Sequence, residues 1–328
     1  MEKSPLQPAP VGAIRFNTDS SKLEYYDGNQ WVNITSTSPE AQTGGTRGVW
    51  MGGQSPSAQD RIDYANLSTA GDAIDFGNLT TARGSNGDGG MASRTRGFIA
   101  NGTSPIAGQI GYITFSTTGD EVDFGDMASN ITNGVGTASD STRGLMFGGY
   151  AAPVTTNVIQ YITMASSGNG IDFGDLDHSG SSSACGSPTR ACEWSSGNEI
   201  EYVTISTLGN TAQFGSSLSN GGHKACSSNA VRGLCSGTEV GPAAVNNIEY
   251  ITFTTLGTTS DFGDLSTVRC EGSSASSPTR SVNGGGTSAT DVMDYVKIMS
   301  TGNAVDFGNL TVGRAHADAS SNGHGGLG

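Results

Sequence analysis

Residues 61–77 read RIDYANLSTAGDAIDFG, two short segments separated by a glycine-containing turn. In the first segment, Ile62 and Tyr64 alternate with polar residues. In the second segment, Ile74 and Phe76 do the same. Alternation with a period of two is typical of strands that bury one face. The stretch therefore predicts a β-hairpin with an apolar side.

The same pattern recurs six times along the chain. Its markers are an arginine, then an Ile/Met-x-Tyr step, then an Asp-Phe-Gly triplet, of which one copy reads Gln-Phe-Gly. The phenylalanines of the triplets are Phe76, Phe124, Phe173, Phe214, Phe262 and Phe307. The arginines are Arg47, Arg96, Arg143, Arg190, Arg232 and Arg280. Three markers in one order predict six copies of a single structural unit, with each phenylalanine packed in the core and its Asp and Gly shaping the turn that follows.

Each unit holds four predicted strands, which favours an all-β fold and a β-propeller with four-stranded blades. The first unit offers strands at 46–53, 61–67 and 73–77, followed by a segment rich in small residues at 82–90. The repeat region, 46–328, ends on another such segment, Ala315 to Gly325. We expect this last segment to complete the first blade and to close a six-bladed ring. An open β-solenoid is the competing interpretation, although it needs no such offset between the two ends.

Residues 1–36 lack the repeat and form a predicted separate module. Short strands are expected at 13–16, 23–26 and 31–34. A segment of this size cannot bury its aromatic residues alone, so we expect it to attach the chain to partners or to other copies of itself. The residues expected to do so are Phe16, Tyr25, Tyr26 and Trp31. Residues 37–45 are rich in Ser, Thr and Gly and are interpreted as a linker.

The composition and charge of the chain argue against several classes of function. The chain has 30 acidic against 16 basic residues, a net charge of −14, which argues against nucleic-acid binding and against an anionic membrane surface. No apolar run is long enough for a transmembrane helix. The first residues lack the apolar core of a signal peptide, so secretion is not expected.

The sequence indicates no cofactor. The five cysteines, none spaced C-x-x-C, and the four histidines do not suggest a structural zinc site, so the thiols are interpreted as small buried residues. Cys185 and Cys192 flank a turn and are candidates to face each other across a hairpin. Calcium at the repeated aspartates is conceivable, but the change to Gln213 in one copy argues against an ion in every unit. The repeated arginines are expected to pair with carboxylates of neighbouring blades or to line a pore.

Two resemblances are carried by these residues. The glycine pair that follows the first strand of a unit, and the later aromatic residue, resemble kelch repeats. The segments Gly12–Asn17 and Leu23–Gly28, together with Trp31, resemble a short module of bacteriophage tail-fibre and other virion appendage proteins. The acidic repeats rich in Gly, Ser and Thr are similar to appendage proteins of marine phages, cyanophages among them. The resemblance implies a homotrimer whose N-terminal module binds other virion proteins, and a location on the virion after assembly in the host cytoplasm.

We therefore expect a non-enzymatic virion protein that contacts a glycan or protein of the host surface. Connections that vary between repeats are the expected binding loops, because variable loops on a rigid scaffold commonly carry recognition. Their candidate ligand-facing residues are Gln54, Asp60, Thr103, Gln109, Tyr150, Asn157, Glu239, Asn247, Thr287 and Asp291. Two alternatives remain: a capsid decoration or head-fibre protein without a receptor role, and a propeller glycan hydrolase. The hydrolase requires convergent carboxylates, which the sequence does not reveal.

Overall fold

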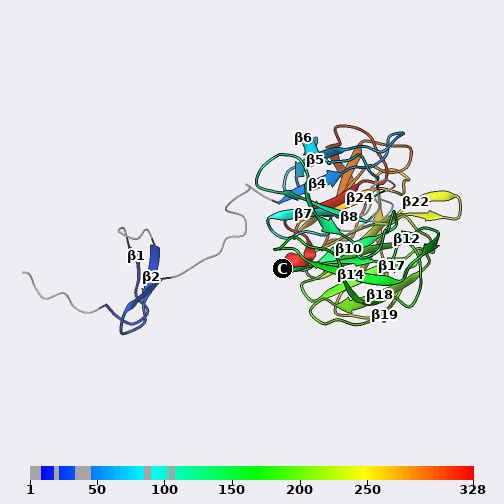
Figure 1. Cartoon of the computed structure of the whole chain (residues 1–328). Helices are drawn as coiled ribbons and strands as arrows, with labels where there is room; N and C mark the ends of the chain where they lie inside the picture. Colours follow the sequence, from blue (N-terminus) through cyan, green and yellow to red (C-terminus); the bar gives the residue numbers. More distant parts are fainter. Residues whose placement is uncertain (1–8, 18–21, 34–45, 85–89, 101, 103–107) are drawn as a thin grey trace, which may run out of the picture. The chain divides into compact units, whose positions relative to one another are not determined.

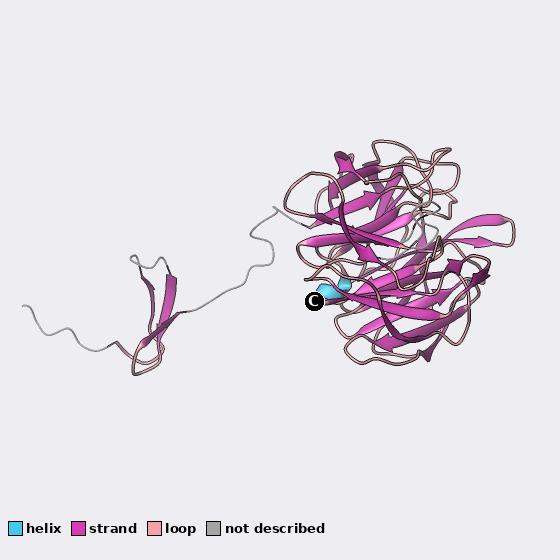
Figure 2. Ribbon diagram, in the orientation of Figure 1, coloured by secondary structure: helices cyan, strands magenta, loops and turns pink. Residues whose placement is uncertain are grey.

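The computed structural model describes residues 9–17, 22–33, 46–84, 90–100, 102 and 108–328. The chain divides into two compact units, Met1–Gln42 and Thr43–Gly328. Strands dominate the described residues, and the one helical element among them is the 3₁₀ turn η1 (Gly325–Leu327) (Figure 2). Among these residues, none of the helical structure is long and apolar enough to cross a membrane. The residues expected to form the linker, 37–45, lie outside the described residues.

The smaller unit is a three-stranded antiparallel sheet of β1 (Ile14–Asn17), β2 (Lys22–Tyr26) and β3 (Trp31–Asn33). The strands start and end within one residue of their expected positions where they are described; position 34 lies outside the described residues. Ile14 is paired with Tyr25 in the register of the first two strands.

The larger unit contains, in its described residues, six antiparallel sheets of three or four strands and one two-stranded ribbon (Figure 1). Five have four strands and one has three. In sheet order, sheet 1 is β28 (Asp318–Ser321), β4 (Arg47–Met51), β5 (Arg61–Asn66) and β6 (Ile74–Asn78). Sheet 2 is β7 (Arg96–Ala100), β8 (Gln109–Thr114) and β9 (Val122–Asp126). Sheet 3 is β10 (Gly136–Ser139), β11 (Arg143–Phe147), β14 (Val158–Thr163) and β15 (Ile171–Asp175).

The remaining sheets follow in chain order. Sheet 4 is β16 (Ser182–Gly186), β17 (Arg190–Ser195), β18 (Glu199–Thr204) and β19 (Ala212–Ser216). Sheet 5 is β20 (Ala225–Ser228), β21 (Arg232–Val240), β22 (Ala243–Thr252) and β23 (Ser260–Asp264). Sheet 6 is β24 (Ser273–Ser276), β25 (Arg280–Gly284), β26 (Val292–Lys297) and β27 (Val305–Asn309). A two-stranded ribbon, β12 (Tyr150–Ala151) and β13 (Val154–Thr155), extends the connection between β11 and β14.

The C-terminal strand pairs with the first repeat. Strand β28 lies antiparallel to β4, with Ser320 opposite Val49. The expected pairing of the last segment with the first unit is therefore present, and it covers four residues, Asp318–Ser321. In sheet 2 the corresponding first strand was expected near 82–90, where positions 85–89 lie outside the described residues; the nearby bridge joins Ala92 to Gly97.

The Asp-Phe-Gly triplet is a β-bulge rather than an exit turn, which corrects the expectation from sequence. In sheet 1, Gly77 is paired with Ile62 and Asp75 with Asp63, so Phe76 is the extra residue. A bulge re-aims the side chain of the unpaired residue. Here it turns Phe76 into the core, where it is 3% exposed. The same register shift occurs in all six sheets.

The bulge also joins each sheet to the next. Because Phe76 is left out of the strand ladder, its carbonyl oxygen is free, and it accepts a hydrogen bond from Gly119 N of sheet 2 at 2.8 Å. The equivalent bond recurs at every junction, and the one from sheet 6 leads back to sheet 1, where Gly71 N donates to Phe307 O at 2.7 Å. A Cβ atom at Gly77 would lie 2.3 Å from Gly119 O, so this close approach requires glycine.

The hydrophobic core is divided among the junctions between sheets. Six buried clusters each combine residues of two neighbouring sheets, and one of them joins sheet 6 to sheet 1 through Phe307 and Trp50. Ile74, in contrast, is 59% exposed, because β6 is the outermost strand of its sheet. The turn η1 contacts β10, β16 and β20, the first strands of three different sheets.

None of the six repeat arginines forms an ion pair with a carboxylate of a described residue, which corrects the first of their two expected roles. Each stacks on the tyrosine of its own sheet, as Arg47 does 4.5 Å from the ring centroid of Tyr64. Each also donates to a backbone carbonyl of the next sheet, as Arg143 does to Ile205 O at 2.9 Å. The six arginines therefore connect neighbouring sheets through neutral acceptors.

The cysteines are buried, in agreement with their interpretation as core residues. Cys185 and Cys192 are direct cross-strand partners, and Cys226 and Cys235 form a second such pair that the sequence did not suggest. Burial raises the pKa of Cys185 and of Cys192, so both thiols are held in the unreactive protonated form.

Candidate functional site

One end of the six sheets carries the connections that differ most between repeats. We call it the loop end; it comprises the connections between the second and third strands of each sheet and the segments that leave the outermost strands. These two kinds of connection bond to each other, for example through Gly149 N and Gly180 O at 2.8 Å. The β21–β22 hairpin projects from this end (Figure 1). In sheet 4 the corresponding connection shrinks to a turn at Gly197 and Asn198.

Several of the candidate ligand-facing residues are bound into the scaffold. Gln109 accepts from Arg83, Asn157 donates to Leu176 O, Asn247 donates to Ser219 and Thr287 donates to Cys270 O. Gln54 is half-buried beside Ala315. Asp60 and Asp291 are exposed, and Tyr150 and Glu239, at the projecting connections, are half-buried. Thr103 lies outside the described residues.

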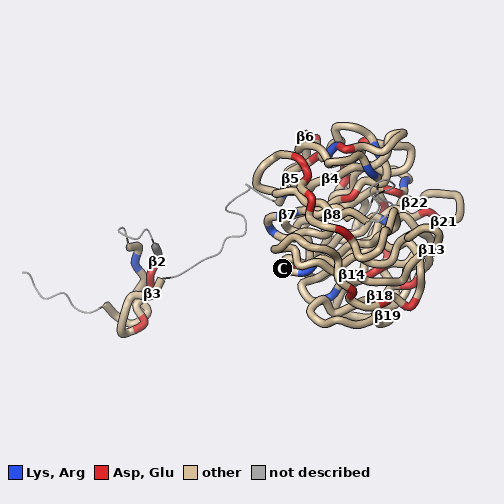
Figure 3. Tube along the Cα trace, viewed as in Figure 1, with Lys and Arg blue, Asp and Glu red and all other residues tan. Residues whose placement is uncertain are grey.

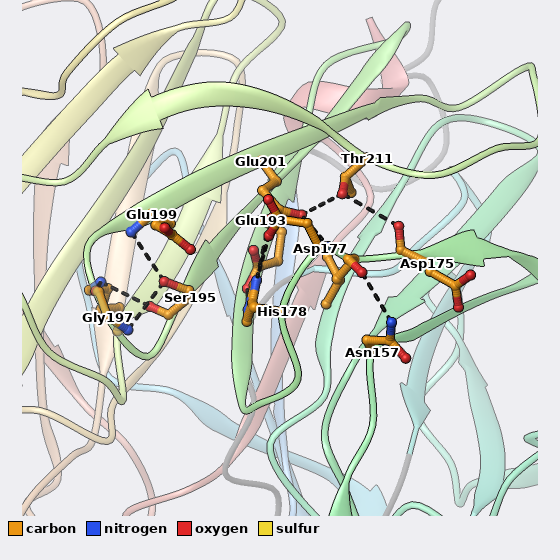
Figure 4. A network of polar contacts seen from close by, with 12 residues as sticks. Asn157, Asp175, Asp177, His178, Glu193, Ser195, Gly197, Glu199, Glu201 and Thr211 are labelled. Carbon is orange, nitrogen blue, oxygen red and sulfur yellow. Dashed lines mark hydrogen bonds and ion pairs between the residues drawn. The ribbon is translucent and has the colours of Figure 1, made fainter.

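The acidic charge of the chain is spread over the larger unit (Figure 3). One group of charged side chains converges at the loop end between sheets 3 and 4, and we call it the His178 cluster (Figure 4). It consists of Asp177, His178, Glu193, Glu199 and Glu201. Asp177 and His178 lie on the connection from β15 to β16, and the three glutamates lie on β17 and β18.

His178 lies between two buried carboxyl groups. Its Nδ1 is 3.3 Å from Glu201 Oε1, and its Nε2 is 3.6 Å from Glu193 Oε1. Thr211 Oγ1 donates to the second oxygen of Glu201. Neither oxygen of Glu193 accepts a hydrogen bond of ordinary geometry from a described residue. Lys224, also buried, donates to Gly197 O at 2.9 Å and so holds the short turn between β17 and β18.

Burial and pairing set the protonation of this cluster. Burial raises the pKa of Glu193 to about 8, so this side chain is a neutral acid at pH 7. The hydrogen bond with Glu201 raises the pKa of His178 to about 9. Burial would raise the pKa of Glu201, but its hydrogen bonds, first that with His178, lower it to about 2. The cluster therefore contains an imidazolium–carboxylate pair beside a protonated carboxyl group.

The cluster is a variant of a contact that recurs between the sheets. Glu201 occupies the place of Asp63 in sheet 1 and of Asp294 in sheet 6, between the Ile or Met and the Tyr of the third strand. Those aspartates pair with buried arginines, Arg314 at 2.9 Å and Arg269 at 2.6 Å. In sheet 4 a histidine takes the role of the arginine. The pair of His178 and Glu201 therefore corresponds to the inter-sheet ion pairs of sheets 1 and 6.

Access limits what the cluster can do chemically. A glycosidase needs two carboxyl groups that flank a bound sugar, one as acid and one as base or nucleophile. Glu193 is 0% and Glu201 1% exposed, so neither can approach a glycosidic oxygen in this conformation. The opposite pKa shifts of the two groups come from structural burial and pairing.

The smaller unit presents its aromatic residues on two different faces. Phe16 is 61% and Tyr25 40% exposed, on an apolar face that also carries Ile14. Tyr26 and Trp31 lie on the opposite face with their rings 5.5 Å apart. There the Arg15 guanidinium, 4.1 Å from the centroid of Trp31, also pairs with the buried Glu24 at 2.8 Å. The four aromatics expected to mediate attachment therefore divide into two pairs.

Sequence reasoning did not single out the His178 cluster. His178 and Glu193 are 15 positions apart, and only the packing of sheet 3 against sheet 4 brings them together. The polar residue of the third strand was the available indication, because an acid between Ile or Met and Tyr recurs at Asp63, Glu201, Glu249 and Asp294. Neither the protein-family models nor the curated proteins contain a match to this chain.

Proposed function

We propose that the six sheets are the blades of a closed six-bladed β-propeller. The support is the repetition of one junction. The carbonyl of the bulge phenylalanine accepts a bond from the following sheet six times, and the sixth bond connects sheet 6 with sheet 1. The pairing of β28 with β4 then joins the two ends of the repeat region, in the manner of propellers.

We propose further that this propeller is a binding scaffold and that ligand is bound at the loop end. The observation that carries this proposal is the contrast within each repeat. The bulge phenylalanine, the tyrosine and the arginine recur in the same register in all six sheets, whereas the connection between second and third strands ranges from the turn at Gly197 to the ten-residue strand β22 and its partner β21. Variation confined to loops on a uniform scaffold is typical of recognition surfaces.

The smaller unit is proposed to attach the chain and to join three copies. Its apolar face carries Ile14, Phe16, Leu23 and Tyr25, all at least 40% exposed, in a sheet of three short strands. Exposed apolar patches of this kind mark interaction sites. Together with the resemblance of the module to virion appendages, this supports a phage tail fibre or appendage that contacts a glycan or protein of the host surface.

The two alternatives differ in what they require. A capsid decoration or head-fibre protein would share the fold and the attachment module but bind no receptor. A glycan hydrolase would need accessible acid and base groups, and the convergent carboxyls of the His178 cluster are buried. The non-enzymatic binding role is therefore the function that the geometry favours.

A cell-binding assay tests this proposal. Fluorescently labelled full-length protein is added to host cells, and binding is compared with that of a variant in which residues 240–243 are replaced by Gly-Asn, the turn found in sheet 4. Loss of binding with an unchanged melting temperature is expected, because these residues form the exposed tip of the β21–β22 hairpin. A matched control replaces Thr117 and Thr118, in the exposed turn between β8 and β9 at the opposite end of the sheets, by Gly-Asn and should bind like the wild type. Wild-type protein that binds no host cell, yet localises to the capsid, would favour the decoration role.

A further inference from the structure

A second group of charged side chains lies at the loop end, away from the His178 cluster. His223, Glu271 and His316 come from three successive connections, those that lead into β20, β24 and β28. Their ligand atoms all lie within 4.8 Å of one another. His316 Nε2 is 3.5 Å from Glu271 Oε1, and the two imidazole rings are 6.0 Å apart.

Backbone hydrogen bonds connect the three residues one after another. Glu271 N donates to His223 O at 3.1 Å, and His316 N donates to Glu271 O at 2.9 Å. Each residue stands two positions before the first strand of its sheet, and each has a left-handed backbone, with φ of 55°, 59° and 55°. At the matching position before β10 the chain has Gly134, with φ of 72°. Three long side chains thus occupy positions that the fold would fill most easily with glycine.

A fourth potential ligand completes the group. Glu239, on the projecting hairpin strand β21, places its Oε2 3.4 Å from His223 Nε2. The side chains of His223, Glu271 and His316 retain between 14% and 30% of their exposure, so an ion can reach them from solvent. The group therefore combines two imidazoles and two carboxylates at an accessible, preorganised position.

We propose that His223, Glu271 and His316 form a site for a divalent transition-metal ion, with Zn²⁺ as the ion and Glu239 as the fourth ligand. Nitrogen donors of this kind disfavour Ca²⁺ and Mg²⁺, which take oxygen ligands. Donors bonded to one tetrahedral Zn²⁺ are about 3.3 Å apart, given bonds near 2.0 Å. The separations of 3.4 Å and 3.5 Å are close to that value. The other donor pairs of His223, Glu271 and His316 lie within 4.8 Å, so these side chains would move closer together around the ion.

The ion would link four elements of the propeller. It would bridge the connections between sheets 4, 5 and 6, the segment that precedes the closing strand β28, and the base of the β21–β22 hairpin. This proposal is independent of receptor binding, because it concerns the ion alone. It predicts a metal that stabilises ring closure and orients the hairpin.

The experiment measures Zn²⁺ binding to full-length protein by equilibrium dialysis and by the shift in melting temperature. Wild-type protein should bind one Zn²⁺ per chain with a dissociation constant in the micromolar range or below, and the melting temperature should rise with Zn²⁺ concentration, because the ion binds only the folded state. Co²⁺ should show the intense visible bands of a tetrahedral site. Calcium at the same concentration should give no shift.

Glycine variants separate metal binding from folding. His223→Gly and His316→Gly place glycine at left-handed positions, so without metal their melting temperatures should equal or exceed that of the wild type. Both should lose the bound Zn²⁺ and the Co²⁺ bands. His178→Gln is the control and should retain them. Wild-type protein that binds no Zn²⁺, or glycine variants that still bind it, would overturn the proposal, and loss of the ion in His178→Gln would place it in the other cluster.

Discussion

The guanidinium of Arg280 donates a hydrogen bond to the carbonyl oxygen of Leu67 at 3.3 Å, although 213 positions separate them in the chain. Arg280 opens β25 in sheet 6, and Leu67 follows β5 in sheet 1. The five other repeat arginines make the same contact with the sheet that follows their own. The bond is thus the sixth of a series in which each sheet is bonded to the next, and it connects sheet 6 with sheet 1. It therefore supports the closed ring that we propose.

Removal of the C-terminal strand should open this arrangement. A chain that ends at Gly313 lacks β28, which leaves β4 as an unpaired edge and removes Ala319 from the core cluster shared by sheets 1 and 6. Exposed strand edges promote aggregation. We expect soluble aggregates by size-exclusion chromatography and a lower melting temperature. A truncated protein that is monodisperse and melts like the full chain would contradict closure by β28.

Replacement of a bulge phenylalanine should be strongly destabilising. Phe124 is 3% and Phe262 2% exposed, and each packs edge-to-face on the tyrosine of its own sheet. Phe124→Ala or Phe262→Ala should lower the free energy of unfolding by about 3–5 kcal/mol, as measured by chemical denaturation. Ile171→Ala, at an outer position that is 54% exposed, is the control and should change little. Losses below about 1 kcal/mol for both phenylalanines would show that the triplet is not a core element.

The glycine of the triplet should be as important as the phenylalanine. A Cβ atom at Gly125 would lie 2.6 Å from Gly168 O, and its backbone φ is 149°. Gly125→Ala should therefore force sheets 2 and 3 apart and cost about 1–3 kcal/mol, as overpacking generally does. Gly168→Ala, on the other side of the same contact, meets no atom within 4 Å and should be tolerated. Equal melting temperatures for the two variants would argue against a tight junction.

Stability should decrease as the pH rises above neutrality. The folded protein holds protons on Glu193, with a pKa of about 8, and on His178, with a pKa of about 9. The unfolded chain releases them near about 4.3 and about 6.5. Between the unfolded and the folded pKa of each group, the folded state binds more protons than the unfolded chain. The stability that each group contributes is therefore complete below its unfolded pKa and is lost as the pH rises through its folded pKa.

The melting temperature should therefore fall from about pH 4.3, where Glu193 begins to contribute, most steeply between about pH 6.5 and about pH 8, where both groups contribute, and level off near about pH 9. Glu193→Gln keeps the shape of the side chain and removes its proton, so it should flatten this decline. Glu199→Gln, at the exposed rim of the same cluster, should leave the decline unchanged. A decline of equal slope in all three proteins would show that the buried acid is not its source.

Deletion of residues 1–40 should abolish self-association. The exposed apolar face of the smaller unit includes Phe16 and Tyr25, whereas the larger unit buries its core between its own sheets. Light scattering should show a trimer for the full chain and a folded monomer for the deletion. Phe16→Ser, on the exposed face, should weaken the trimer, and Asn29→Ser, in the exposed turn between β2 and β3, is its control. A deletion that retains the oligomeric state of the full chain would place the interface in the larger unit.

The periodicity of the chain determined most of the architecture. Alternation around Tyr64 and Phe76, repeated six times, was enough to predict the strands, because the burial of one strand face leaves a period of two in the sequence. The offset between the two ends indicated that the last segment pairs with the first repeat, and β28 does so. These features are local or recur at a fixed interval, so they can be read without knowledge of the packing.

Tertiary structure decided how the repeats meet. The sequence placed Asp75 and Gly77 in a turn, but the register makes Phe76 a bulge, which depends on the partner strand. Sheet 2 gives a second example. The carboxylate of Glu121 fills the space that a side chain at Gly111 would occupy, and there it pairs with Arg83. Likewise His223, Glu271 and His316 are 45 or more positions apart and converge only where three connections leave their sheets. Contacts between side chains of different repeats depend on how the sheets pack against each other. The spacing of residues along the chain does not reveal this packing.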